Sequence, residues 1–195
     1  MRLSWIFFLL VATALAGCGE EAAEDVCEPG PREGYPTAGL GVEKGDVIAD
    51  LTLVNPDGSA FKLSELYQDS EGRRRLLLVS TAAGWCTACI EEQPALQALY
   101  DNHRDNGLEI VVAYFQDQNF NAATAAHAEA WKAQYNLTFP VVADPDNKLK
   151  PYYPGSDDSA APLNMMVDLC TMEILTSGVS FDESQVNAVI KSKLP

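Results

Sequence analysis

Runs of hydrophobic residues alternate along this chain with longer segments in which hydrophobic residues recur at helical spacing. Unbroken apolar runs predict buried strands, and alternating runs predict half-buried strands. The strands predicted in this way cover residues 45–53, 60–63, 76–80, 108–115, 139–143, 163–168 and 172–177. Helical spacing predicts a short turn at 64–66 and helices at 90–104, 121–135 and 182–193, the last with Asp182 as its N-cap.

The order of these elements indicates the fold class. Strands alternate with helices through the middle of the chain, and a hairpin and a closing helix follow. This order predicts an α/β domain in which a central mixed sheet is covered on both faces and flanked by helices. Residues 55–58, Asn-Pro-Asp-Gly, form a turn signature between the first two strands, which predicts an N-terminal β-hairpin extension.

The first residues predict export from the cytoplasm. Arg2 precedes an apolar stretch, residues 3–16, that is too short for a permanent membrane helix and ends in small residues. Residues 1–17 are therefore predicted to be a signal peptide. The sequence Leu15-Ala16-Gly17-Cys18 resembles the bacterial lipobox, which implies cleavage before Cys18, diacylation of Cys18 and a lipid-tethered protein in the cell envelope. The alternative is an ordinary secretory signal with an incidental cysteine.

The segment after the lipobox predicts how the protein is tethered. In lipoproteins of enteric bacteria, an Asp directly after the lipidated cysteine favours the inner membrane. This chain has Gly19 at that position, so the outer membrane is the expected location, with the protein facing the periplasm or the exterior. Residues 18–41 are rich in Glu, Gly and Pro and lack periodicity, which predicts a lipid-anchored tether and arm. The domain itself is predicted to span residues 42–195.

Charge narrows the range of partners. The chain carries a formal net charge of −15, and its basic residues cluster only at Arg73–Arg75. Nucleic acid, which needs a basic surface, is therefore not an expected partner. An acidic surface of this kind is typical of a solvated protein face.

Two cysteines carry the most informative chemistry in the chain. Cys86 and Cys89 lie three residues apart, after a predicted buried strand and before a predicted helix. At a helix N-terminus, unpaired backbone N–H groups and the positive end of the helix dipole lower the pKa of a thiol. Two thiols at this spacing can form a small reversible disulfide ring, which predicts a redox site.

Four motifs follow one another in order along the chain. They are Gly45-Asp46 with Asp57-Gly58 and Leu63-Ser64, the segment Trp85–Pro94, Phe139-Pro140-Val141 with Asp144, and Ala161-Pro162 before a strand. Together they resemble the thioredoxin-fold redoxins of the TlpA-like and AhpC/TSA thiol–disulfide oxidoreductase group. The resemblance runs from about residue 45 to residue 193 and implies a thioredoxin-like fold.

The resemblance implies a role for each residue of the site. Cys86 matches the attacking cysteine, Cys89 the resolving cysteine, and Trp85 a residue that lines the site. Pro162 matches a cis-proline beside the dithiol, which would turn the Ala161 backbone toward a substrate strand. The redox-active disulfide is then the working group, with no metal or other cofactor. The implied partners are protein thiol and disulfide clients and an unidentified envelope reductant, with client reduction as the expected direction.

Glu92 matches an acidic position of the family and leaves two alternatives open. One is a proton-transfer role, and the other is an exposed carboxylate that is favourable near the helix N-terminus. Ser80 stands where thioredoxin carries a buried Asp, six residues before the first cysteine, so a proton acceptor for Cys89 is not evident at that position. Pro94 is expected to kink the helix.

Other functions compete with dithiol exchange. A peroxidase of this group needs Thr or Ser three residues before its reactive cysteine, and Ala83 holds that position before Cys86. Copper proteins of the Sco type use a wider cysteine spacing and a His near the late strand, where this chain has Asn164, and His103 and His127 fall in predicted helices. A Sco-type copper role and a redox-silent structural disulfide remain the alternatives.

Cys27 and Cys170 complete the set of five cysteines. In an oxidising compartment, unpaired thiols tend to become oxidised. Cys27 lies in the predicted arm and Cys170 in the late hairpin, so we expect a structural disulfide between them that holds the arm across the domain. The alternative is two independent thiols.

Overall fold

The computed structural model describes residues 32, 34–155 and 161–194 of the chain. The predicted signal peptide, the lipidation site Cys18 and the arm cysteine Cys27 lie outside the described residues. Within the described ranges, no helix is long and apolar enough to cross a membrane. In chain order the elements are β1 (Thr52–Val54), β2 (Ala60–Lys62), α1 (Ser64–Tyr67), β3 (Leu76–Ala83), α2 (Thr87–His103), η1 (Arg104–Asn106), β4 (Leu108–Gln116), α3 (Ala125–Gln134), β5 (Val141–Ala143), η2 (Lys150–Tyr152), β6 (Leu163–Asp168), β7 (Ile174–Val179) and α4 (Glu183–Lys193).

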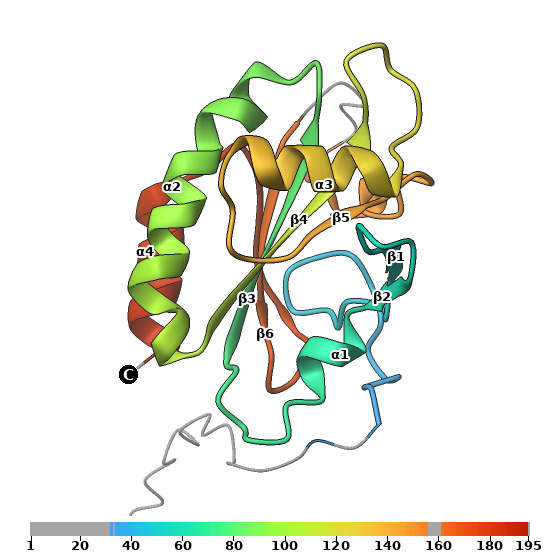
Figure 1. Ribbon diagram of the computed structural model, residues 1–195. Coiled ribbons are helices and arrows are strands. Elements are labelled where there is room, and N and C mark those ends of the chain that lie inside the picture. Colours follow the sequence, from blue (N-terminus) through green and yellow to red (C-terminus); the bar gives the residue numbers. More distant parts are fainter. Residues whose placement is uncertain (1–31, 33, 156–160, 195) are drawn as a thin grey trace, which may run out of the picture.

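A seven-stranded mixed sheet forms the centre of the structure (Figure 1). Its strand order is β2-β1-β5-β4-β3-β6-β7. β3, β4 and β5 run parallel to one another. β6 is antiparallel to β3, β7 to β6, and β1 to both β5 and β2. This arrangement confirms the predicted α/β class with a central mixed sheet and an N-terminal hairpin.

β3 occupies an inner position in the sheet, between β4 and β6. All eight of its residues are buried, because strands flank it on both edges and packed layers cover both of its faces. A strand buried in this way is largely apolar rather than alternating, which is why its sequence was recognisable. β3 ends at Ala83, three residues before Cys86, so a fully buried strand fixes the position of the first cysteine.

Helices α2, α3 and α4 pack on one face of the sheet. The crossovers β3-α2-β4 and β4-α3-β5 step in the same direction across the sheet, and right-handed crossovers then place both helices on the same side. Figure 1 shows α2 and α4 lying side by side. The buried helix residues on this face include Leu96 and Leu99 from α2, Ala128 and Trp131 from α3, and Val186 and Ile190 from α4.

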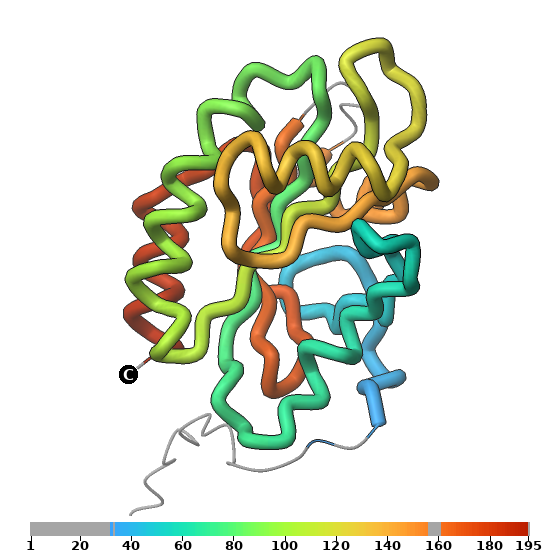
Figure 2. The backbone as a smooth tube through the Cα atoms, viewed as in Figure 1, coloured from blue at the N-terminus to red at the C-terminus, as the bar shows by residue number. Residues whose placement is uncertain are grey.

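The opposite face is covered by shorter elements. α1, η2 and the stretch before β1 pack against it, and Figure 2 shows the blue N-terminal segment lying close to β1 and β2. The Tyr35 hydroxyl donates to the Ile48 carbonyl at 2.8 Å, so the contacts of the domain begin upstream of residue 42. The Arg32 guanidinium also reaches the domain, where it donates to the carbonyl oxygens of Tyr67, Arg74 and Leu169.

Two predicted elements differ most from the structure. The helix predicted at 121–135 begins only at Ala125, because Thr124 caps it through a hydrogen bond from the N–H of His127 to Thr124 Oγ1 at 3.3 Å. The residues before Thr124 instead form a turn around Asp117, whose Oδ1 accepts from the N–H of Asn121 at 2.9 Å. The strand predicted at 45–53 is reduced to β1, since the earlier residues make only isolated bridges.

The packing of α2 predicts a large effect of truncating its core. Leu96 is fully buried between α2 and the sheet. Leu96→Ala is expected to lower the free energy of unfolding by about 2–5 kcal/mol in urea denaturation, because it removes buried surface and leaves a cavity. Leu40 is 52% exposed and serves as the control, so Leu40→Ala should change stability by less than about 0.5 kcal/mol. Equal losses in the two variants would contradict this placement of α2.

Candidate functional site

Cys86 and Cys89 are joined by a disulfide where β3 passes into α2. Their sulfur atoms lie 2.09 Å apart and their Cα atoms 5.2 Å apart. Cys86 is the N-cap of α2, and its Sγ accepts a hydrogen bond from the N–H of Cys89 at 3.1 Å. One of the N–H groups that a helix leaves unpaired at its start is therefore directed at this sulfur. The predicted position of the pair at the strand–helix junction is confirmed.

The two cysteines differ slightly in access. Cys86 is 4% exposed, whereas Cys89 is fully buried. The N–H of Cys86 donates to the Ala83 carbonyl at 3.1 Å, which closes a tight turn between strand and helix. A disulfide partner approaching from solvent therefore meets Cys86 first.

The segment that contains Pro162 joins the same site. The peptide bond between Ala161 and Pro162 is cis, as the family resemblance implies. Ala161 is half-buried and packs against the core cluster that includes both cysteines. Just after the proline, the N–H of Leu163 donates to Thr81 Oγ1 at 2.8 Å, and Thr81 Oγ1 also lies 2.5 Å from the Tyr153 hydroxyl. β3 thus holds the start of β6 beside the dithiol.

Trp85 lies directly before the first cysteine and is half-buried. Its indole Nε1 donates to Gln116 Oε1 at 3.1 Å, at the end of β4. Its ring meets Phe115 edge-on, with centroids 6.0 Å apart, and stacks on Phe120 at 5.4 Å. These contacts fix the orientation of the indole next to Cys86 in the chain, and the site-lining role of Trp85 stays a prediction.

Glu92 is buried rather than exposed, with only 9% of its surface accessible. The N–H of Phe181 donates to its Oε1 at 2.6 Å, and Asn164 Nδ2 donates to its Oε2 at 3.0 Å. Burial raises the pKa of this carboxyl, and the two hydrogen bonds partly oppose the rise. The alternative of an exposed carboxylate at the start of the helix is therefore wrong, because Asn164 and Phe181 enclose the side chain.

Other buried polar groups surround Glu92 and Cys89. Ser80 on β3 lies opposite Asn164 on β6 in the sheet register. Gln93 Nε2 donates to the Cys89 carbonyl at 2.6 Å. Ser80 Oγ, Gln93 Oε1 and Asn164 Oδ1 are buried without a hydrogen-bond partner within the described residues. The sequence alone did not identify Asn164 as a hydrogen-bond partner of Glu92. A polar residue within the otherwise apolar run 163–167 was nevertheless a usable signal.

The two histidines lie away from the cysteine pair in the sequence, and His127 has a local structural role. His127 takes part in the capping box of α3, where its Nδ1 accepts from the N–H of Thr124 at 3.2 Å. His103 is the last residue of α2. Across residues 32, 34–155 and 161–194, no three His, Cys, Asp or Glu side chains gather in a way that could hold a metal ion.

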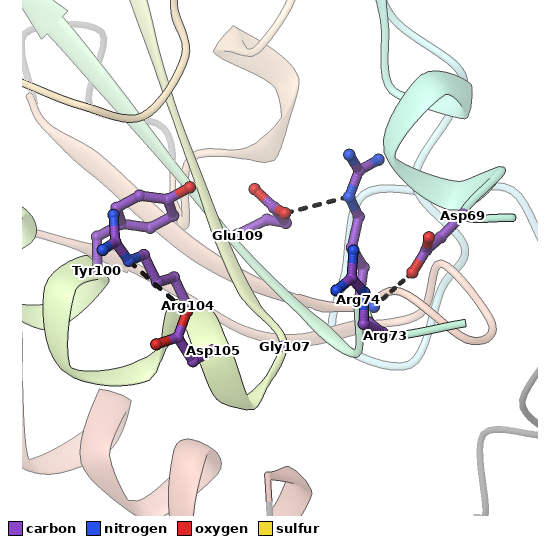
Figure 3. Close-up of a pocket in the computed structure, with 8 residues that line it drawn as sticks. All are labelled: Asp69, Arg73, Arg74, Tyr100, Arg104, Asp105, Gly107 and Glu109. Atoms are coloured by element: carbon purple, nitrogen blue, oxygen red, sulfur yellow. Dashed lines mark hydrogen bonds and ion pairs between the residues drawn. The ribbon is translucent and has the colours of Figure 1, made fainter. Parts of the chain in front are cut away.

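A charged pocket of about 510 Å³ opens at the other end of the parallel strands (Figure 3). It is lined by residues before β3, by residues at the end of α2 and in η1, and by residues around the start of β4, whereas the cysteines follow the end of β3. Two of its acidic side chains have partners in Arg74: Arg74 Nε lies 3.1 Å from Glu109 Oε1, and the backbone N–H of Arg74 donates to Asp69 Oδ2 at 2.7 Å. Arg104 and Asp105 form a longer pair at 3.8 Å. We assign this pocket no part in the cysteine chemistry.

Cys170 lies in the connection between β6 and β7 and is disulfide-bonded. Its predicted partner, Cys27, lies outside the described residues. The Cys27–Cys170 pairing therefore stays a prediction.

Curated relatives match about half of the chain. The thioredoxin-like protein YneN of Bacillus subtilis is 26% identical over 110 residues, which are 56% of this chain and 59% of that protein. The thiol-disulfide oxidoreductase ResA of Oceanobacillus iheyensis is 28% identical over 109 residues, which are 56% of this chain and 53% of that protein. The aligned regions thus cover less than two thirds of either relative.

Solved structures and a family model match a larger part of the chain than the curated relatives do. The thioredoxin domain of a thiol-disulfide oxidoreductase from Bacteroides vulgatus superimposes with a TM-score of 0.59 at 17% identity, over 77% of this chain and 98% of the other. This likeness supports a thioredoxin-like fold. The AhpC/TSA family model matches residues 44–168, which is more than half of the chain. With the cysteine pair at the strand–helix junction and the cis-proline segment beside it, the chain belongs to the AhpC/TSA family.

Proposed function

We propose that this protein is an extracytoplasmic thiol–disulfide oxidoreductase that reduces client disulfides through Cys86 and Cys89. The observation that carries the proposal is the hydrogen bond from the Cys89 N–H to Cys86 Sγ at the N-terminus of α2. In the reduced protein, this N–H and the helix dipole favour a thiolate at Cys86 over a neutral thiol. The thiolate is the form that attacks disulfides.

The exchange reaction proceeds in two steps. The Cys86 thiolate attacks one sulfur of the client disulfide, the client S–S bond breaks, and its second sulfur leaves as a thiolate. Cys89 then loses its proton and attacks Cys86 Sγ, which breaks the mixed disulfide and releases the client's remaining thiolate. The client gains two electrons, and the protein ends with the Cys86–Cys89 disulfide. A dithiol reductant of the envelope returns the protein to its reduced form.

The cis-proline segment is proposed to position the client. Ala161 is half-buried at the edge of the core cluster that contains the cysteines, and the bonds of Thr81 hold the backbone that follows it. An extended client strand that pairs with the Ala161 backbone would bring its disulfide close to Cys86. Trp85 forms the neighbouring wall of the site.

Glu92 is proposed to exchange the proton of Cys89. The two residues are three positions apart on α2, so their side chains leave the helix on neighbouring faces. Burial raises the pKa of Glu92 and brings it closer to the range in which a carboxyl both accepts and returns a proton near neutral pH. Glu92 would then be the proton acceptor for Cys89 that Ser80, which has no carboxylate, does not provide.

We infer the compartment from the N-terminal sequence. The predicted signal peptide of residues 1–17 and the lipobox ending at Cys18 support an envelope protein tethered by lipid, with the outer membrane as its expected location. The lipid on Cys18 is thus the proposed membrane contact. Protein disulfides and an envelope dithiol reductant are the proposed partners.

Separate replacement of the two cysteines tests their roles. Reduced Cys89→Ser protein should accumulate a mixed disulfide between Cys86 and a disulfide-bonded peptide, because the resolving thiol is absent. Reduced Cys86→Ser protein should accumulate little. Non-reducing mass spectrometry with peptide mapping measures both adducts, and Cys27 and Cys170 are present in both variants as internal controls. The reverse pattern would assign the attacking role to Cys89.

The burial of Glu92 predicts a pH-dependent effect on stability. Because the folded-state pKa lies above the ordinary value of 4.5, the stability that the neutral carboxyl provides is complete below that value and is lost as pH rises through the raised pKa. The side chain of Glu92→Gln cannot ionise. The free energy of unfolding of the variant should therefore rise relative to that of wild type as pH increases from 4.5 through the raised pKa, and the difference should then stay constant. Urea denaturation from about pH 4 to about pH 8 measures the difference. A constant difference across this range would contradict a perturbed carboxyl.

The same variant separates a proton-transfer role from a purely structural one. If Glu92 exchanges a proton with Cys89, Glu92→Gln should slow the resolution of a preformed mixed disulfide by about 100-fold and remove its pH dependence in that range. Formation of the mixed disulfide by Cys86 should change much less. An unaltered resolution rate would leave Glu92 with only its contacts to Asn164 and Phe181.

A further inference from the structure

The turn between β4 and α3 is held in a fixed shape beside the cysteine pair. The N–H groups of Asn119 and Asn121 donate to Asp117 Oδ1 at 2.8 and 2.9 Å, and Asn121 Nδ2 donates to Asp117 Oδ2 at 3.0 Å. The backbone closes the turn through hydrogen bonds from Asp117 N–H to Asn121 and from Phe120 N–H to Asp117. The carboxylate of Asp117 is therefore occupied inside the turn, and Phe120 stands at its tip.

Phe120 adopts a backbone conformation that is unusual for its residue type. Its φ is 64°, in the left-handed region, which is unfavourable for a bulky side chain. The side chain is also 64% exposed, so it gains little from burial in the fold. Strain that so little burial offsets points to a functional constraint on the position.

The strained turn presents the Phe120 ring to the dithiol site. Phe120 stacks on Trp85, with ring centroids 5.4 Å apart and planes inclined by 21°, and Trp85 precedes Cys86 directly. Gly84 permits this approach, because a Cβ at that position would lie 2.5 Å from the Gln118 N and 2.9 Å from the Asp117 carbonyl carbon. We call the stacked pair Trp85 and Phe120 the aromatic platform.

The platform continues an apolar border around the attacking cysteine. Ile90, one turn along α2 from Cys86, is 37% exposed. Half-buried Ala161 packs against the same core cluster as Trp85. A client chain that reaches Cys86 therefore passes apolar side chains, and Phe120 gives that path a flat, exposed ring.

We propose that the aromatic platform selects polypeptide clients that carry an aromatic or large apolar side chain next to the reactive cysteine. The inference rests on the proposed exchange reaction and names its substrate class. An aromatic ring of the client would extend the Trp85–Phe120 stack while its disulfide lies at Cys86. A small disulfide without such a side chain reaches Cys86 but gains nothing from Phe120.

Rates on three matched disulfides test this selection. The full-length chain, reduced with dithiothreitol and freed of it, is mixed in single turnover with a disulfide-bonded peptide whose cysteine is flanked by Phe, with the same peptide carrying Ser instead, and with glutathione disulfide. Wild type should favour the Phe peptide. Phe120→Gly keeps the left-handed backbone without strain but removes the ring, so it should slow the Phe peptide by about three- to tenfold and leave the other two substrates unchanged.

Two further variants separate recognition from structure. Phe120→Tyr retains the ring and should keep the wild-type preference, and Leu40→Ala removes an exposed side chain of another segment and should have no effect. Equal rates of wild type and Phe120→Gly on the Phe peptide, or an equal slowing on all three substrates, would overturn the inference while leaving the exchange reaction intact. Wild-type protein that exchanges with none of the three disulfides would instead contradict the proposed function, and the inference with it.

Discussion

The hydrogen bond from the Cys89 N–H to Cys86 Sγ is the interaction on which the site depends. It exists because β3 ends at Ala83 and α2 begins at Thr87, which makes Cys86 the N-cap. A cap residue normally offers an oxygen to the first free N–H groups of its helix, and here a sulfur takes that place. The same geometry that starts the helix thereby lowers the cost of a negative charge on the first sulfur.

The sheet topology brings the second half of the site to the same place. β6 runs antiparallel to β3, so its first residues lie beside the last residues of β3, as the pairing of Ser80 with Asn164 shows. Pro162 precedes β6 directly, and the cis bond therefore falls at the cysteine end of the sheet. The Asn164 side chain on β6 also donates a hydrogen bond to Glu92. β6 and the residues just before it therefore supply both the cis-proline segment and a partner of the buried carboxyl.

The parts of the fold that follow from local pattern were predictable from the sequence. The largely apolar strand β3 and the strand–helix junction at Cys86 could be located because burial on both faces leaves a clear signal. The helix predicted from residue 121 failed, because the bonds between Asp117 and Asn121 close a turn that outweighs helical spacing. The sequence did not single out Phe120 for the same reason, since its proposed role in client selection depends on the shape of that turn.

The burial of Glu92 depends on contacts that sequence spacing does not reveal. Its hydrogen-bond partners lie 72 and 89 residues away, and the second is a backbone N–H that any residue but proline would supply. Only the assembled sheet and the turn before α4 show that this carboxyl is enclosed. Sequence resemblance therefore identified the position of Glu92 but left its environment open.

The reduction potential of the Cys86–Cys89 couple tests the central claim most directly. Equilibration of the protein with defined ratios of reduced and oxidised dithiothreitol or glutathione, with the Cys86–Cys89 state measured by mass spectrometry, gives this value. A protein that reduces client disulfides should have a potential near that of thioredoxin, about −270 mV. A potential near that of the oxidant DsbA, about −120 mV, would contradict the account.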